Sequence, residues 1–106
     1  MPISMDAIRH KLARGQVDLV LHAVTEALDD LIFIDELETA LPAGEIIEDD
    51  AERSRCLVFI SLGTSEFVHV VVEYAEWLLD PEADLTIVTV YRPDPARWID
   101  GRRRRT

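Results

Sequence analysis

Three runs of β-branched and apolar residues follow one another closely in the second half of the chain. They span residues 56–61, 67–74 and 85–91. Such residues are typical of β-strands. The connections between the runs are too short for helical crossovers, so we expect the strands to pair in the antiparallel sense. A shorter strand predicted over 45–48 would lie at an edge, and Pro93 and Pro95 prevent regular continuation after the last run.

The middle run has two different faces, because side chains alternate along a strand. One face is uniformly apolar and is expected to meet the helices; it carries Val68, Val70, Val72 and Tyr74. The other face is mixed and carries Phe67, His69, Val71 and Glu73. Phe67 and Val71 are predicted to be exposed there. We therefore expect the mixed face to be an interaction surface, first of all for self-association.

Apolar residues recur at helical spacing in the first third of the chain. Ile8 and Leu12 lie one turn apart, which predicts a helix over 5–13 that ends before Gly15. A second amphipathic helix is predicted over 18–30 from Leu21, Val24 and Leu28, at positions i, i+3 and i+7. This stripe is expected to pack against the sheet, with Asp18 as the N-cap.

A third, short helix is predicted over 36–41, and Pro42 and Gly44 end it. The length of 106 residues leaves room for one core. We predict an α+β fold with two to three N-terminal helices packed on one face of an antiparallel sheet of about four strands. Residues 1–101 would form this single domain, followed by a disordered basic tail over 102–106.

Acidic residues outnumber basic ones, with 21 Asp and Glu against 11 Lys and Arg, a net charge of -10. Four of the basic residues are the arginines at 102–105, so the rest of the chain has 21 against 7, or -14. An acidic body repels phosphate groups, and we expect it not to bind RNA.

The cysteine content and the hydropathy pattern favour a cytoplasmic location. Cys56 is the only cysteine, which rules out an intramolecular disulfide and fits a reducing compartment. No apolar run reaches the roughly 18 residues that span a bilayer. Residues 1–10 lack the basic flank and apolar centre of a secretory signal, so no membrane partner is expected.

His22 is the first candidate catalytic residue. It lies one helical turn before Glu26, and Asp18 extends the same line. The spacing is compatible with half of a metal site, with a general base oriented by a carboxylate, or with a surface ion pair. The chain has no zinc-type Cys/His array, glycine-rich phosphate loop or nucleophile elbow, so we predict no metal and no cofactor.

His69 is the second candidate catalytic residue. Glu73 shares its strand face but lies about 13 Å along the strand, at roughly 3.3 Å per residue. His69 would therefore need a partner from a neighbouring strand or from the C-terminal segment. The alternative is a structural histidine that a neighbouring backbone or side-chain group satisfies.

The segment after the last strand contains further candidate binding residues. Tyr91 and Trp98 can pack as an apolar clamp, with the prolines fixing the chain between them. Arg92 and Arg97 could bind an anion or pair with nearby carboxylates. The full set of predicted binding residues is Phe67, Val71, Glu73, Tyr91, Arg92 and Arg97.

Five blocks between about Val20 and Trp98 resemble a bacterial family of unknown function. In order, they are His22-Ala23 and residues 40–49, 56–58, 69–72 and 88–98, of which the last is the most specific. That family is similar to small RelE- and BrnT-like toxins with a barnase/RelE-type fold. The resemblance implies a toxin-like domain with a cognate antitoxin-like partner, and it supports a role for His22.

The chain departs from this family on the second helix, where Glu26 and Asp30 replace arginines. In a ribonuclease-like site, arginine neutralises the phosphate, which a carboxylate would repel. We therefore expect ribonuclease activity to be weakened or lost.

Three functions stay open. The first is a divergent toxin-like domain of a toxin–antitoxin pair. The second is a non-catalytic interaction module that uses the mixed sheet face or the acidic patch of Glu26, Asp29 and Asp30, with a second copy or another protein as partner. The third is a small metal-dependent enzyme that uses His22.

Overall fold

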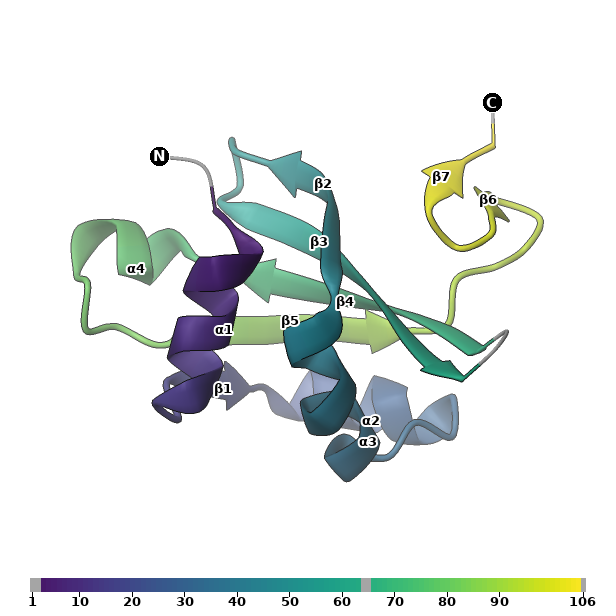
Figure 1. The fold of residues 1–106 in the computed structure, drawn as a ribbon, viewed down its shortest axis with the longest axis horizontal. Coiled ribbons are helices and arrows are strands. Elements are labelled where there is room, and N and C mark those ends of the chain that lie inside the picture. The colour runs from purple at the N-terminus through teal and green to yellow at the C-terminus, as the bar shows by residue number, and fades with distance from the viewer. Residues whose placement is uncertain (1–2, 64–65, 106) are drawn as a thin grey trace.

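The computed structural model describes residues 3–63 and 66–105. Its main sheet has five strands in the order β1-β5-β4-β3-β2 (Figure 1). They are β1 (Val17–Leu19), β2 (Glu45–Asp50), β3 (Arg55–Gly63), β4 (Glu66–Glu73) and β5 (Leu85–Tyr91). β2 to β5 pair antiparallel, as predicted, whereas β1 runs parallel to β5. The turn predicted at Thr64 and Ser65 lies outside the described residues.

The described chain has four α-helices rather than two or three. They are α1 (Met5–Ala13), α2 (Leu21–Asp29), α3 (Ile34–Ala40) and α4 (Ala75–Leu79), and a 3-10 turn, η1 (Leu41–Ala43), follows α3. α1 and α3 lie across one face of the sheet (Figure 1). α4 lies in the connection between β4 and β5 and was missed from the sequence. The α+β class is confirmed, and the main sheet has five strands where about four were predicted.

The core lies between the helices and the inner face of the sheet, and its register is the predicted one. Val70 of β4 is aligned with Val58 of β3 and Val90 of β5. Val68 and Val72 share that face, and all three valines are fully buried. The helices contribute Ile8, Ala23, Ala27, Leu37 and Leu41 to the same cluster. The burial expected for the apolar face of β4 is confirmed.

α2 turns a different side to the core than its apolar stripe suggests. Ala23 and Ala27 are 0% exposed, whereas Leu21 is 79% and Leu28 is 52% exposed. Small alanines let the helix approach the sheet closely, and the leucines then lie outside the contact. The predicted orientation of this helix was wrong.

The predicted start of α2 was also wrong. The helix begins at Leu21, and Asp18 lies in β1 instead of capping the helix. The reason is tertiary, because Val17 to Leu19 pair with the buried strand β5.

The C-terminal arginines are folded back onto the sheet, in contrast to the disordered tail expected there. β6 (Trp98–Ile99) and β7 (Arg103–Arg104) form a small antiparallel hairpin. The Arg104 guanidinium makes two hydrogen bonds to Glu48, at 2.7 and 3.0 Å, and lies 4.6 Å from the centre of the Trp98 ring. Carboxylates on the edge strand β2 thus supply the counter-charges that hold this segment. Thr106 lies outside the described residues.

Candidate functional site

His22 lies in the first turn of α2 with its side chain mostly in solvent. Its Nε2 atom is 3.4 Å from Glu26 Oε2, one helical turn away. Glu26 Oε1 also accepts a bond from the Val90 amide at 3.3 Å. The pair therefore has the geometry of a surface contact in which the carboxylate already has a backbone partner.

Glu26 and Asp30 complete the open edge of β5. β1 ends beside Ile87, where the Val20 amide donates to the Ile87 carbonyl. Beyond that point Asp30 Oδ2 accepts from the Arg92 amide at 2.9 Å, as Glu26 does from Val90. These two carboxylates occupy the place of a strand that would otherwise continue β1.

The Arg92 side chain also contacts the end of α2. Its Nε atom donates to the Asp30 carbonyl at 2.9 Å. The Arg92 side chain thus pairs with a backbone carbonyl, and the expectation that this arginine binds an anion or pairs with a nearby carboxylate stays a prediction. Arg97 is exposed, and its backbone amide donates to the Asp94 carbonyl at 2.9 Å.

His69 is fully buried on the other face of the sheet, so it is not brought together with His22. Its Nε2 atom lies 2.5 Å from the Gly101 carbonyl, which can only accept, so Nε2 carries the proton. Nδ1 then accepts from the Tyr91 hydroxyl at 3.1 Å. The ring also packs edge-on against Trp98, with 4.4 Å between ring centres. Both polar partners come from the neighbouring strand and the C-terminal segment.

This environment keeps His69 neutral. Burial lowers its pKa below the usual 6.5, while the bond to Gly101 and the nearby Glu48 oppose that shift. An enclosed, neutral ring with both nitrogens engaged holds two parts of the chain together, and a substrate cannot reach it in this conformation. Its proposed catalytic role stays a prediction.

The C-terminal segment covers part of the mixed sheet face. The Phe67 ring lies 5.2 Å from the Phe59 ring, and a side chain at Gly101 would come within 3.0 Å of both. Phe67 is therefore partly buried, and the expectation that it is freely exposed was wrong. Val71 is half-buried, and Glu73 pairs with Arg55 at 3.0 Å.

A shallow hollow of about 310 Å³ remains on this face, beside Val71 and Tyr91. Most of its charged side chains are already paired, Arg104 with Glu48 and Arg53 with Asp50. Their charges largely cancel, which leaves no strong attraction for an anion. The hollow brings together two of the predicted binding residues but no reactive group.

Cys56 borders this hollow with its side chain buried. Burial, with a smaller contribution from Asp49, raises the pKa of its thiol to about 12. The reactive thiolate is essentially absent at neutral pH. Cys56 therefore behaves as a small core residue.

Within residues 3–63 and 66–105, no group of three or more His, Cys, Asp or Glu side chains is placed to hold a metal ion. In the same residues, no helix is long and apolar enough to cross a membrane.

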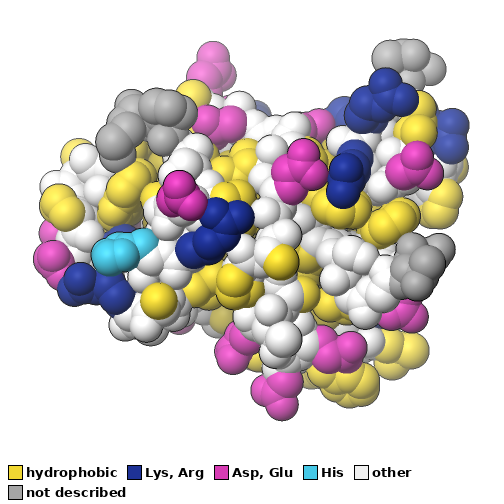
Figure 2. Space-filling view, in the orientation of Figure 1, with side chains coloured by type: hydrophobic (Ala, Val, Ile, Leu, Met, Phe, Trp, Pro, Cys, Tyr) yellow, Lys and Arg dark blue, Asp and Glu magenta, His cyan; other side chains and the backbone are white. Residues whose placement is uncertain are grey.

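Sequence reasoning missed an exposed apolar surface along α2 and the turn that follows it. We call it the α2–α3 surface; it consists of Leu21, Leu28, Leu31 and Phe33, all of which are exposed. Leu21 and Leu28 lie two turns apart on one side of α2. Figure 2 shows hydrophobic side chains along the lower edge of the molecule, over α2 and α3, with acidic side chains beside them.

Leu31 ends α2 in an unusual way. Its φ is 57°, and it is 73% exposed. Its amide donates to the Leu28 carbonyl, and the Ile32 amide donates to the Ala27 carbonyl. These two bonds form the common helix-ending motif in which the left-handed residue is usually glycine. A leucine at a glycine position, following a helix, was the signal in the sequence that could have drawn attention to this surface.

Comparison with known proteins adds a family. No curated protein and no solved structure matches the chain. Residues 20–92, more than half of the 106-residue chain, match the family described as Domain of unknown function (DUF4258). The matched region runs from the start of α2 to the end of β5 and includes both histidines discussed above. The chain belongs to the DUF4258 family.

Proposed function

We propose that this protein is a non-catalytic interaction module that binds another protein through its α2–α3 surface. The observation that carries the proposal is Leu31, a large apolar side chain held in solvent on a left-handed backbone. That backbone costs a non-glycine residue roughly 1–2 kcal/mol. In the free chain the exposed side chain gains little from burial in return. Burial against a partner would supply the missing stabilisation.

The charges around this surface favour a basic partner. Asp29, Asp35 and Glu36 are exposed next to it, and the chain carries a net charge of -10. A partner segment that combines apolar side chains with Lys or Arg would match both properties. A second copy of the chain would bring like charges together, so we place self-association second.

The arrangement of the candidate catalytic residues gives less support to an enzyme. His22 and His69 lie on different faces of the sheet, and His69 is enclosed. Glu26 and Asp30 bind the edge of β5.

The test uses a synthetic amphipathic helix with a leucine face and a lysine face as probe. We expect the intact protein to bind it and Leu31→Asn to weaken binding about tenfold, since a buried leucine contributes roughly 1.5–3 kcal/mol. Asn tolerates the left-handed conformation, so the variant should be at least as stable in urea denaturation. Fluorescence anisotropy of the labelled peptide measures the affinity.

Leu79→Asn is the matched control, because Leu79 on α4 is 90% exposed and lies outside the α2–α3 surface. It should bind the peptide as the intact protein does. Equal affinities for both variants would contradict the proposal, and so would equal binding of a peptide with glutamates in place of the lysines. Sedimentation equilibrium on the same samples would reveal a dimer that Leu31→Asn dissociates, if the partner is a second copy.

The alternative is a divergent toxin-like domain related to RelE- and BrnT-like proteins, with an antitoxin-like partner. The observation in its favour is the accessible His22–Glu26 pair. Expression of the intact protein would then arrest growth. Relief of this arrest by His22→Ala, and by co-expression of the product of an adjacent gene, would favour this alternative.

A further inference from the structure

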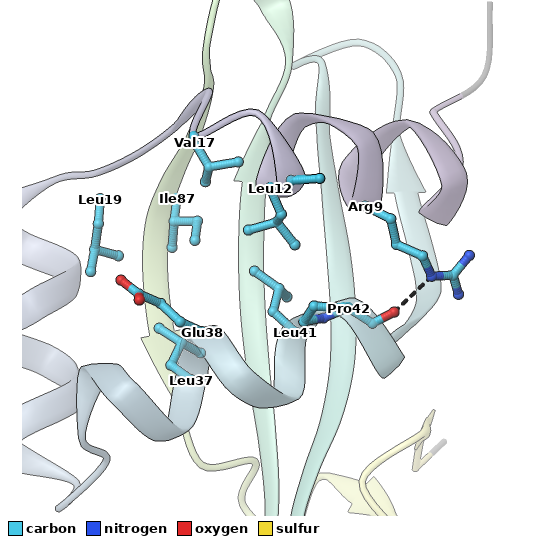
Figure 3. A pocket seen from close by; sticks show the side chains of 11 residues that line it. Arg9, Leu12, Val17, Leu19, Leu37, Glu38, Leu41, Pro42 and Ile87 are labelled. Atoms are coloured by element: carbon cyan, nitrogen blue, oxygen red, sulfur yellow. Dashed lines mark hydrogen bonds between the residues drawn. The ribbon is translucent and has the colours of Figure 1, made fainter.

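A pocket of about 510 Å³ lies on the helical side of the sheet and is lined by none of the residues of the α2–α3 surface (Figure 3). α1 borders it on one side, α3 and η1 border it on the other, and β1 and β5 form its floor. Its wall is mainly aliphatic and includes Leu12, Val17, Leu19, Leu37, Leu41 and Ile87. A space of this size and character is typical of small-molecule sites.

Two charged side chains line the pocket, and only one of them is free to act on a ligand. The Arg9 guanidinium donates to the Pro42 carbonyl and to Asp6, both at 2.7 Å, and it points away from the space (Figure 3). Glu38 extends its carboxylate toward Leu19 and Ile87 (Figure 3). Within the described residues, Glu38 has no ion pair. The pocket is thus an aliphatic space with one uncompensated negative group.

We propose that this pocket binds an aliphatic primary ammonium ion, with its chain along the leucines and its charged head at Glu38. Burial of the chain removes apolar surface from water, and the head meets the exposed Glu38 carboxylate beside an aliphatic wall. A fatty acid would place its own carboxylate against Glu38 and would be repelled. The proposal is independent of the α2–α3 surface, because the two share no residue.

The experiment is a titration of the isotopically labelled protein with hexylammonium and octylammonium, followed by amide NMR shifts. We expect saturable shifts at Gly15, Val17 and Leu19. Octylammonium should bind more tightly than hexylammonium, with an affinity about fourfold higher for each additional methylene that enters the pocket. Saturation without dependence on chain length would overturn the proposal, as would shifts confined to Leu28, Leu31 and Phe33.

Head-group specificity is tested with octanoate and octanol. Octanoate should bind more weakly than octanol, and octylammonium should bind most tightly. Glu38→Gln should lower the affinity for octylammonium by about fivefold, which is the upper range for an ion pair near the surface. It should leave the affinity for octanol unchanged. Glu36→Gln removes the same charge from the same helix outside the pocket, and it should change the affinity for neither ligand. Equal losses in both variants would reduce the effect to net charge and overturn the assigned role of Glu38.

Discussion

Lys11 is a lysine whose side chain lies inside the protein. It is 3% exposed, and its Nζ atom donates to the Pro81 carbonyl at 2.7 Å and to the Ala83 carbonyl at 2.6 Å. Gln16 Oε1 lies 3.5 Å away as a weaker partner. Through these contacts α1 holds the loop between α4 and β5. Carbonyl groups thus solvate the buried ammonium in place of water.

Replacing this ammonium should therefore cost stability. We expect Lys11→Met to lower the free energy of unfolding by about 2 kcal/mol, because hydrogen bonds from a charged donor are lost and two carbonyls lose their partner. Urea denaturation measures the change. His10→Met, at the exposed neighbouring position, is the control and should have little effect. Similar losses in both variants would show that helix propensity, and not the ammonium, accounts for the result.

Among the elements, the C-terminal hairpin depends most on individual contacts. It has only two short strands, and it is fixed to the sheet by the Glu48–Arg104 pair and by edge-on packing of Trp98 against His69. Arg102 also lies 4.7 Å from the centre of the Phe59 ring. Trp98 itself is buried, so apolar packing and the charged contacts both hold the segment on the sheet.

A double-mutant cycle on Glu48→Gln and Arg104→Gln should give a coupling energy of about 0.5–1 kcal/mol, because the pair is doubly hydrogen-bonded but exposed. The coupling should fall as salt rises. Trp98 emission should shift to longer wavelength in both single variants as the hairpin loosens. Arg103→Gln, on the same strand, is the control and should leave both readouts unchanged. A coupling energy near zero would mean that packing holds the hairpin.

The elements also differ in how far their own sequence predicts them. β3, β4 and β5 follow from runs of β-branched residues, and β5 has the predicted bounds. β1 has only three residues and no pattern of its own, so its structure depends on pairing with β5. α2 has two sides that could be buried, and close approach of Ala23 and Ala27 to the sheet outweighs the larger leucines.

The candidate sites were harder to predict because, like β1 and the orientation of α2, they depend on contacts between distant segments of the chain. The key partner of His69 is the backbone carbonyl of Gly101, which any residue type would offer. The pocket between α1 and α3 depends on how two helices are spaced. Neither feature leaves a residue pattern in one stretch of sequence, whereas the parity of β4 does.

At the scale of the whole molecule, pH acts on stability through the buried imidazole. The pKa of His69 is lowered in the folded protein, so only the unfolded chain takes up its proton as pH falls through about 6.5. Proton uptake favours the unfolded chain. The contribution of neutral, buried His69 to the free energy of unfolding is therefore complete above pH 6.5 and is lost as the pH falls below it.

Between pH 7.5 and 5.5 we expect this one group to remove up to about 1.4 kcal/mol from the free energy of unfolding. Urea denaturation at both pH values, on the intact protein and on His69→Gln, isolates the effect as a difference. His22→Gln removes an exposed histidine and should retain the pH dependence of the intact protein. A slope that survives in His69→Gln would assign the effect to the carboxylates instead.

The carboxylates that complete the edge of β5 also decide how copies of this chain meet in a crowded solution. A sheet grows into aggregates when a free edge offers unpaired amides to another strand. Glu26 and Asp30 occupy two such amides beyond the part of β5 that β1 covers, and the edge strand at the opposite border, β2, carries Glu45, Glu48 and Asp50. The part of β5 beyond β1 and the β2 border therefore resist strand-to-strand polymerisation. Mutations that remove both acceptors, Glu26→Ala and Asp30→Ala, would leave these amides free to pair with a strand of another copy, even where they leave the fold of the single chain intact.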